Sequence, residues 1–465
     1  MLMKSNVVQI PSVPPERRGL RLLHDIKERG VLYYLKELEQ REGAFASLER
    51  RDGTTVLVND AEAVRHILVE NHSKGAPAEF LYPIVGKGVF LAEGEAHARQ
   101  RKMAAPYFTP RSHVDMVVQM VAATHEMFER WQVNANRPTP LRLDREFPGL
   151  AFNILLRALF HETNAQTAAG MQGALKAIFE KAGDRMWQLI KLPAEVVYNV
   201  SSEFRQARRI LFETADDLIA RRREALKDPD FEHKEDLLSQ LVKNYGISKE
   251  DQAILRHEVI TYLVAGHETT GQGLTFASAY LSQNPQARER LRKEVDSVLK
   301  EADPTFDNIR NLELPEASRA ADEALRLSAP APIVRRRASQ DIYAPLDDGR
   351  HLFIPKGHLI MVSPWVIHRR KQYWGDNAET FDLDHFAGDQ QKSHLNLPFA
   401  SGPRNCIGGP FARTEMIVVG AMLAARYELS VVEPESIKYR YALTTHPDRP
   451  VEAYVKARET YRAAA

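Results

Sequence analysis

The spacing of apolar and polar positions changes several times along the chain. Residues 16–41 are charged with a helical pattern, and 45–58 contains the β-rich run Thr54-Thr55-Val56-Leu57-Val58. From 61 to about 300 the periodicity is helical, with breaks at 75–83, which is rich in Gly and Pro, and at the charged stretch 221–236. Short apolar runs bounded by turns follow Arg326. A helical pattern returns from 410 to about 427, and 437–455 has the pattern of strands.

These patterns predict a mainly α fold with small β-sheets. The chain has no repeats, no low-complexity linker and no shift in composition, so we expect one domain over residues 1–465. Within it we expect an N-terminal arm at about 1–20, a small β-rich part at about 45–60 and 330–365, a helical body at about 61–330 and 406–427, and C-terminal strands at about 437–456.

The amino-acid composition limits which classes of function, metal site and location we expect. With 44% hydrophobic residues the chain can bury a bulky cofactor, and a formal charge of +1 gives no general attraction to nucleic acid. One cysteine excludes an intramolecular disulfide and any all-thiolate metal site, and it suits a reducing compartment. No signal peptide and no membrane span of about 18 apolar residues is evident. We therefore expect a soluble, cytoplasmic monomer.

The lone cysteine lies in a glycine-rich loop just before a predicted helix. The segment 399–410 reads Phe-Ala-Ser-Gly-Pro-Arg-Asn-Cys-Ile-Gly-Gly-Pro. Gly402 and Gly408 allow the backbone to approach a flat ligand, and a helix N-terminus stabilises a thiolate. The alternative is a buried structural cysteine, the commoner fate of a lone thiol. A cysteine-dependent hydrolase would need a partner among the 16 histidines, and no hydrolase-like motif accompanies Cys406.

The loop resembles the signature of the cytochrome P450 family, specifically of a bacterial-type soluble haem-thiolate monooxygenase. Its fixed offsets are filled by Phe399, Gly402, Arg404, Cys406 and Gly408. The resemblance implies a haem b between a long central helix and the helix after the loop, with Cys406 as the axial ligand of the iron. It also implies that Phe399 packs beside the thiolate, Arg404 pairs with a haem propionate and Ala412 lies in the helix behind. A thiolate favours O–O cleavage, which such an oxygenase requires.

A long apolar helix over 257–280 is interrupted by Ala265-Gly266-His267-Glu268-Thr269-Thr270. A glycine costs about 1 kcal/mol relative to alanine, and a Thr hydroxyl can bond back to the preceding turn. We expect a local kink that leaves a groove for a small ligand. Alternatively, Glu268 and Thr269 point to solvent on an ordinary helix. The resemblance implies an oxygen-binding segment beginning at Ala265, with Gly266 against the haem, Thr269 hydrogen-bonding dioxygen and Glu268 relaying protons.

A scaffold pair, Glu323 and Arg326, lies three residues apart on one helical face. In the family such a pair locks the helix to the loop before the cysteine. The third partner there is usually an arginine, but this chain has His385, which can donate hydrogen bonds without a guanidinium fork. We therefore expect a looser or pH-sensitive triad.

Haem propionates need buried cationic partners. His97 and Arg101 are four residues apart on one predicted helical face, and the resemblance adds Arg336 as a third partner. For each of these cations the alternative is a solvated surface charge.

By position against the family, mostly apolar residues line the substrate cavity: Phe80, Val89, Phe90, Leu263, Val264, Ala331, Ile333, Val334 and Leu443. We expect hydroxylation or epoxidation of a largely apolar small molecule, such as a fatty acid, terpenoid, polyketide or aromatic compound of secondary metabolism.

No flavin or nicotinamide motif occurs in the sequence, so electrons are expected from a ferredoxin or flavodoxin with a separate NAD(P)H reductase. Candidate docking cations are Arg99, Lys102, Arg369, Arg370 and Lys371. Two alternatives stay open on the same scaffold. One is a haem-binding carrier or sensor. The other is a peroxygenase, isomerase or dehydratase.

Overall fold

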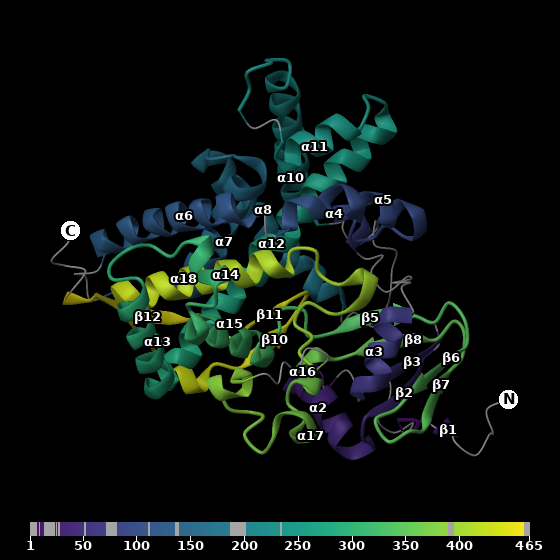
Figure 1. Cartoon of the computed structure of the whole chain (residues 1–465). Coiled ribbons are helices and arrows are strands. Elements are labelled where there is room, and N and C mark those ends of the chain that lie inside the picture. The colour runs from purple at the N-terminus through teal and green to yellow at the C-terminus, as the bar shows by residue number, and fades with distance from the viewer. Residues whose placement is uncertain are drawn as a thin grey trace.

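The computed structural model describes residues 7–8, 10–13, 24, 26, 28–50, 53–70, 81–109, 112–134, 139–186, 201–232, 235–388 and 395–459. As predicted, the described chain is mainly helical with small sheets. Figure 1 shows most of the long helices gathered on one side and the strands β1–β3 and β5–β8 gathered on the other, whereas β12 lies beside α13 and α18. The α-helices are α2 (Val31–Glu42), α3 (Ala61–Glu70), α4 (Tyr82–Val85), α5 (Gly94–Ala104), α6 (His113–Asn134), α7 (Leu143–Phe160), α8 (Ala165–Met186), α10 (Ser202–Ala225), α11 (Leu237–Asn244), α12 (Lys249–Gln283), α13 (Pro285–Val298), α14 (Phe306–Arg310), α15 (Pro315–Leu327), α16 (Pro364–Ile367), α17 (Lys371–Trp374) and α18 (Gly409–Arg426).

The strands form four small sheets. Their orders are β1-β7-β6, β2-β3-β8-β5, β4-β12-β9 and β10-β11. The strands are β1 (Val7–Val8), β2 (Phe45–Arg50), β3 (Gly53–Val58), β4 (Leu141–Arg142), β5 (Val334–Arg337), β6 (Ile342–Pro345), β7 (His351–Ile354), β8 (Leu359–Val362), β9 (Tyr427–Val431), β10 (Tyr439–Tyr441), β11 (Thr445–Pro447) and β12 (Glu452–Ala457).

Several predicted boundaries differ from the structure. Strand β3 pairs in parallel with β8, far along the chain, so residues from 45–58 and from 334–362 contribute to one sheet. The last long helix ends at Arg426, and Tyr427 begins β9, a strand that the pattern did not predict. Helix α10 continues to Ala225, past the start of the predicted break.

The longest helix, α12, lies against α7, α15 and α18 and is buried along much of its length. It begins at Ser248, whose side chain accepts a hydrogen bond from the Asp251 N–H. At Gly271 an added Cβ would lie 2.4 Å from Cα of Pro148 in α7. Glycine is therefore required there for the two helices to approach, and this contact fixes α12 in the core.

Where the chain is described, no helix is both long enough and apolar enough to cross a membrane.

Candidate functional site

The loop that carries Cys406 is held by main-chain geometry. The Cys406 N–H donates to the Phe399 carbonyl at 2.9 Å, and a short 3-10 turn occupies Gly402–Arg404. Gly402 has φ of 74°, and an added Cβ would lie 2.2 Å from the carbonyl oxygen of Leu68. The loop therefore needs glycine at this position for two independent reasons, backbone conformation and close approach.

The thiol of Cys406 is exposed and precedes α18 by three residues. The dipole of that helix favours a negative charge near its N-terminus, which stabilises the thiolate over the thiol. An added Cβ on Gly409 would lie 3.1 Å from the ring of Phe399, so this ring packs against the start of α18. Ala412, predicted to lie behind the cysteine, is in the first turns of the same helix. Gly408 is the N-cap residue of α18.

Arg336 is a buried cation on β5. It is 2% exposed, and Nε and Nη2 have no hydrogen-bond partner among the described residues, while Nη1 donates to the Arg335 carbonyl at 2.9 Å. Burial lowers the pKa of Arg336 to about 10, and the nearby Arg404 adds to the effect. A buried guanidinium with two unsatisfied nitrogens is costly, so this position calls for an anion.

The other predicted cations are Arg404, in the loop itself, and His97 and Arg101, on α5. Arg101 in α5 donates to the carbonyl oxygen of Asn405 at 2.8 Å and also to its side chain, directly beside the cysteine. Arg404 donates to the Ala92 carbonyl at 2.6 Å and to the Glu93 carboxylate at 2.5 Å. Its nearest anion in the structure is therefore a protein carboxylate, and its expected pairing with a propionate stays a prediction. His97 is half-buried on α5, one turn before Arg101.

The polar motif of the central helix lies within α12, which continues through it without a break. The Thr269 hydroxyl donates back to the Ala265 carbonyl at 2.7 Å, as predicted. The expected kink stays a prediction. Helix α7 packs against α12. An added Cβ on Gly266 would lie 1.9 Å from Cδ1 of Leu155 in α7, so the glycine serves helix packing. The expected contact of Gly266 with haem stays a prediction.

The side chain of Glu268 is 15% exposed and does not project into open solvent. Its Oε1 lies 3.9 Å from Nδ1 of His446, a residue of β11 that the sequence reasoning did not single out. This geometry contradicts the interpretation of Glu268 as an ordinary surface acid.

The scaffold triad forms as predicted from the resemblance. Arg326 and Glu323 are both 0% exposed and make two bonds, Nε to Oε2 at 2.6 Å and Nη2 to Oε1 at 2.7 Å. Nδ1 of His385 lies 2.9 Å from Oε1 of Glu323. Arg326 also donates to the carbonyl oxygens of His368, Ala378 and Thr380. The triad therefore ties α15 to the segment that leads to the cysteine loop, with histidine as an adequate third member.

Comparison with known proteins decides the family. The sequence profile described as Cytochrome P450 matches residues 14–451, nearly the whole chain. This chain belongs to the cytochrome P450 family. It is therefore an oxidoreductase of the monooxygenase type, with haem b as cofactor, and P450 enzymes use dioxygen and redox partners.

Curated relatives of this P450 cover most of its length. It is 29% identical over 426 residues to Cytochrome P450 4A14 of Rattus norvegicus, an alignment that covers 87% of this chain and 82% of the relative. It is 30% identical over 398 residues to Taurochenodeoxycholic 6 alpha-hydroxylase of Sus scrofa, an alignment that covers 81% of this chain and 76% of the relative. It is 28% identical over 415 residues to Carotene epsilon-monooxygenase, chloroplastic, of Arabidopsis thaliana, an alignment that covers 84% of this chain and 75% of the relative.

The residues of this P450 fit haem b. The exposed thiol of Cys406 is a suitable iron ligand, and the unsatisfied nitrogens of Arg336 are suitable donors to a propionate. Arg101 stands beside the cysteine on the neighbouring helix. The combination of a thiol with neighbouring cations, rather than any one residue, is what suits the iron and the propionates of haem.

The predicted substrate residues are only partly gathered. Leu263 is fully buried, and Val89, Val264 and Leu443 pack against the same core. Ile333 and Val334 pack against two other clusters, Ala331 and Phe90 are exposed, and Phe80 lies outside the described residues.

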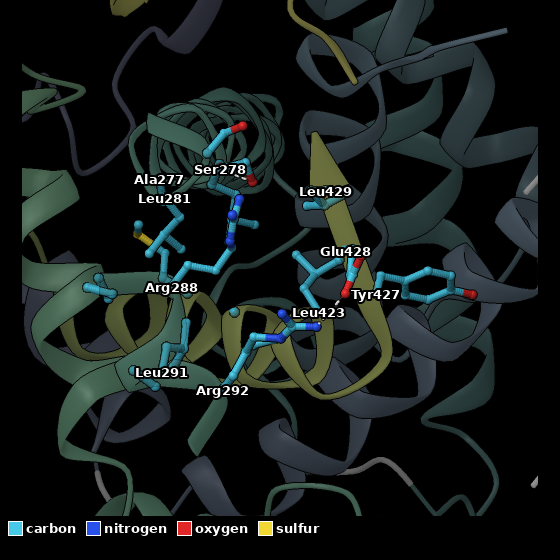
Figure 2. Close-up of a pocket in the computed structure, with 18 residues that line it drawn as sticks. Ala277, Ser278, Leu281, Arg288, Leu291, Arg292, Leu423, Tyr427, Glu428 and Leu429 are labelled. Carbon is cyan, nitrogen blue, oxygen red and sulfur yellow. Dashed lines mark hydrogen bonds and ion pairs between the residues drawn. The ribbon is translucent and has the colours of Figure 1, made fainter. Parts of the chain in front are cut away.

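The cavity shown in Figure 2 is elsewhere, between α12, α13, α15 and α18, and measures about 70 Å³. None of the predicted site residues lines it, and it is too small for the expected substrates.

Two of the predicted docking cations are structural. Arg369 is 6% exposed, donates to the Leu327 carbonyl at 2.6 Å and stacks over the ring of Trp365. Arg370 pairs with Glu39 at 3.1 Å and donates to the Asn59 carbonyl at 2.7 Å. Their assignment to a docking face was wrong, because both side chains are largely buried and bonded within the protein. Arg99, Lys102 and Lys371 are exposed and stay candidates.

Sequence reasoning also missed Glu415 in α18. Its side chain is 1% exposed, both carboxylate oxygens lack a hydrogen-bond partner among the described residues, and burial raises its pKa far above the usual range. The signal was available, since Glu415 directly precedes the apolar run 416–424, and an acid is rarely fully buried without a partner.

Proposed function

We propose that Cys406 binds the haem iron and that this P450 hydroxylates or epoxidises a largely apolar small molecule. The observation that carries the proposal is the cysteine loop, whose glycine-dependent backbone presents an exposed thiol just before the N-terminus of α18. Haem with a thiolate ligand supplies the dioxygen chemistry, because the thiolate donates electron density that favours O–O cleavage.

The proposed role of the protein around that chemistry is to supply hydrogen bonds and protons. The Thr269 hydroxyl is oriented by its bond to Ala265, which leaves its oxygen available to accept a hydrogen bond. Glu268, one residue earlier, is mostly shielded from solvent and has a carboxyl group that can exchange protons. General acid assistance of this type contributes about 10²- to 10⁴-fold in rate.

The substrate is proposed to be a fatty acid, terpenoid, polyketide or aromatic compound. The support is the apolar character of Val89, Leu263, Val264 and Leu443, which share one core around α12. Two relatives have names that refer to taurochenodeoxycholic acid and to carotene, and both of these molecules are largely hydrocarbon.

Electrons are proposed to come from a ferredoxin or flavodoxin with a separate NAD(P)H reductase. The exposed cations Arg99 and Lys102 lie on α5, the helix whose Arg101 touches the cysteine loop, so an acidic partner could dock close to the haem edge. The single cysteine, which suits a reducing compartment, supports a cytoplasmic location.

The proposal is tested by turnover under ¹⁸O-labelled dioxygen. Holoprotein, NADPH, a ferredoxin or flavodoxin system and a panel of the four substrate classes are incubated, and products are analysed by mass spectrometry. We expect one ¹⁸O atom in a product that Cys406→Ser does not form. Products that carry no label, or that form equally well in Cys406→Ser, would refute a monooxygenase reaction at this site.

A further inference from the structure

Strand β11 is fixed against the core by the residue before His446. Thr445 is 0% exposed, donates its hydroxyl to the Ala329 carbonyl at 2.8 Å and donates its N–H to the Pro330 carbonyl at 3.0 Å. The hairpin partner of His446 across the two-stranded sheet is Arg440. Because β11 also packs against α12, the imidazole is carried by a rigid element and faces the central helix.

The imidazole lies next to the acid of the polar motif. Nδ1 of His446 is 3.9 Å from Oε1 of Glu268, and the two side chains are 23% and 15% exposed. This distance is longer than a hydrogen bond, but a small rotation of either side chain or one bridging water would close it. The other ring nitrogen, Nε2, is buried and has no hydrogen-bond partner among the described residues.

Two more polar side chains, one near Glu268 and one near His446 in the sequence, have a buried atom without a hydrogen-bond partner among the described residues. Gln272 lies four residues after Glu268, on the same face of α12, and its Oε1 is buried without a partner in the described part of the chain. The hydroxyl of Thr444, two residues before His446, is also buried without a hydrogen-bond partner among the described residues. Buried polar atoms are normally hydrogen-bonded, so a cluster of unsatisfied ones is typical of a path occupied by ordered water.

The imidazole is neutral at physiological pH. Burial lowers the pKa of His446 to about 4, and the charge of Arg440 across the strand pair adds to this effect. A neutral imidazole can release a proton from one nitrogen while it takes up another at the second, so its net protonation is unchanged after each transfer. His446 is therefore chemically suited to pass protons without carrying a lasting charge into the core.

We propose that His446 is the positioning residue that passes protons to Glu268. The proposal rests on the proposed function, in which Glu268 supplies protons for dioxygen activation. One nitrogen of His446 faces the Glu268 carboxylate and releases a proton to it, and Nε2 takes one up from the polar path beside Gln272 and Thr444.

The contact itself is tested by NMR. Holoprotein labelled with ¹⁵N-histidine is examined in the diamagnetic carbon monoxide form, and the His446 signals are assigned by their loss in His446→Gln. We expect Glu268→Gln to shift both ring ¹⁵N resonances of His446, and to leave those of His351, on a separate sheet, in place. Unchanged His446 resonances in Glu268→Gln would overturn the proposal.

The proton role is tested by coupling, the product formed per NADPH consumed. We expect His446→Phe and His446→Gln each to lower coupling about tenfold, less than the full 10²- to 10⁴-fold effect of a general acid, because water can replace part of the relay. The solvent deuterium isotope effect on product formation should rise in both variants. The substrate-induced spin shift should be unchanged, and His351→Phe should behave as wild type.

A double variant distinguishes the role of His446 from the role of Glu268. If His446 acts through Glu268, then Glu268→Gln combined with His446→Gln loses no more coupling than Glu268→Gln alone. Additive losses, or wild-type coupling in His446→Gln, would overturn the relay while leaving Glu268 in its role. Wild-type coupling in Glu268→Gln would instead remove the proton role from the proposed function.

Discussion

Burial distinguishes three neighbouring arginines on β5 that look alike in the sequence. The sequence gives Arg335, Arg336 and Arg337 as three equal cations, but only Arg336 is fully buried with unsatisfied nitrogens. The resemblance identified this arginine, and the alternation of sides along β5 explains why its neighbours differ. The value of Arg336 as an anion partner follows from its desolvation.

Arg336→Gln should weaken haem retention. A charge-assisted hydrogen bond contributes about 1.5–3 kcal/mol, so we expect haem to dissociate roughly 10- to 100-fold faster, as measured by transfer to excess apomyoglobin. The matched control is Arg337→Gln on the same strand, whose guanidinium donates to the Gly357 carbonyl at 2.9 Å. Equal loss rates in both variants would contradict the assignment of Arg336 to a propionate.

Thr269→Ala should uncouple electron use from product formation. The variant lacks the hydroxyl that Ala265 orients, so we expect less product and more hydrogen peroxide per NADPH, with an unchanged carbon monoxide spectrum. Thr275→Ala is the control, since Thr275 bonds back to Gly271 at 2.8 Å in the same helix. Unchanged coupling in Thr269→Ala would remove the proposed role of this hydroxyl.

Glu258, on α12, gives a pH prediction. Burial raises the pKa of this carboxyl group to about 8, so the folded state binds a proton that the unfolded state releases near its ordinary pKa. Its contribution to stability is full at pH below about 4.5 and is lost as pH rises through about 8. We expect Glu258→Gln to melt at a less pH-dependent temperature between pH 5 and 8 than wild type. Identical slopes of melting temperature against pH would contradict this.

At the scale of elements, the helical pattern predicted α18 to within one residue at each end, but only 257–280 of α12. Helix α12 begins at Lys249, and its first four residues, 249–252, are all polar. The pattern could not predict that Gly266 and Gly271 of α12 pack against Leu155 and Pro148 of α7, because this contact joins two separate elements. Nor could it predict that β3 pairs with β8, because the partners are about 300 residues apart and short apolar runs have no unique register.

The contact between α7 and α12 gives a stability prediction. In Gly271→Ala the new Cβ would meet the Pro148 backbone at 2.4 Å, so we expect a loss of about 1–3 kcal/mol from overpacking. Gly420 in α18 has open space around its missing Cβ, so Gly420→Ala should gain about 1 kcal/mol from helix propensity. Thermal melting of both holoproteins is the measurement, and a Gly271→Ala protein as stable as Gly420→Ala would contradict the packing argument.

At the scale of the whole molecule, the sequence predicted the fold class and the cysteine loop, but it did not predict how the substrate side is assembled. Family positions gave a lining that the structure distributes over three clusters, with Ala331 exposed. Such a cavity depends on how loops approach one another in space, which no local pattern records. His446 was missed for the same reason, because its partner Glu268 belongs to another element.

The central claim is that Cys406 binds the haem iron as a thiolate. The most direct test is the difference spectrum between the reduced carbon monoxide complex and the reduced protein, for wild type and for Cys406→Ala expressed with full haem supply. We predict the band characteristic of thiolate-bound ferrous haem in wild type and its loss in Cys406→Ala, together with the loss of turnover. The same band in both proteins, or a wild-type protein without Soret absorbance, would contradict the account.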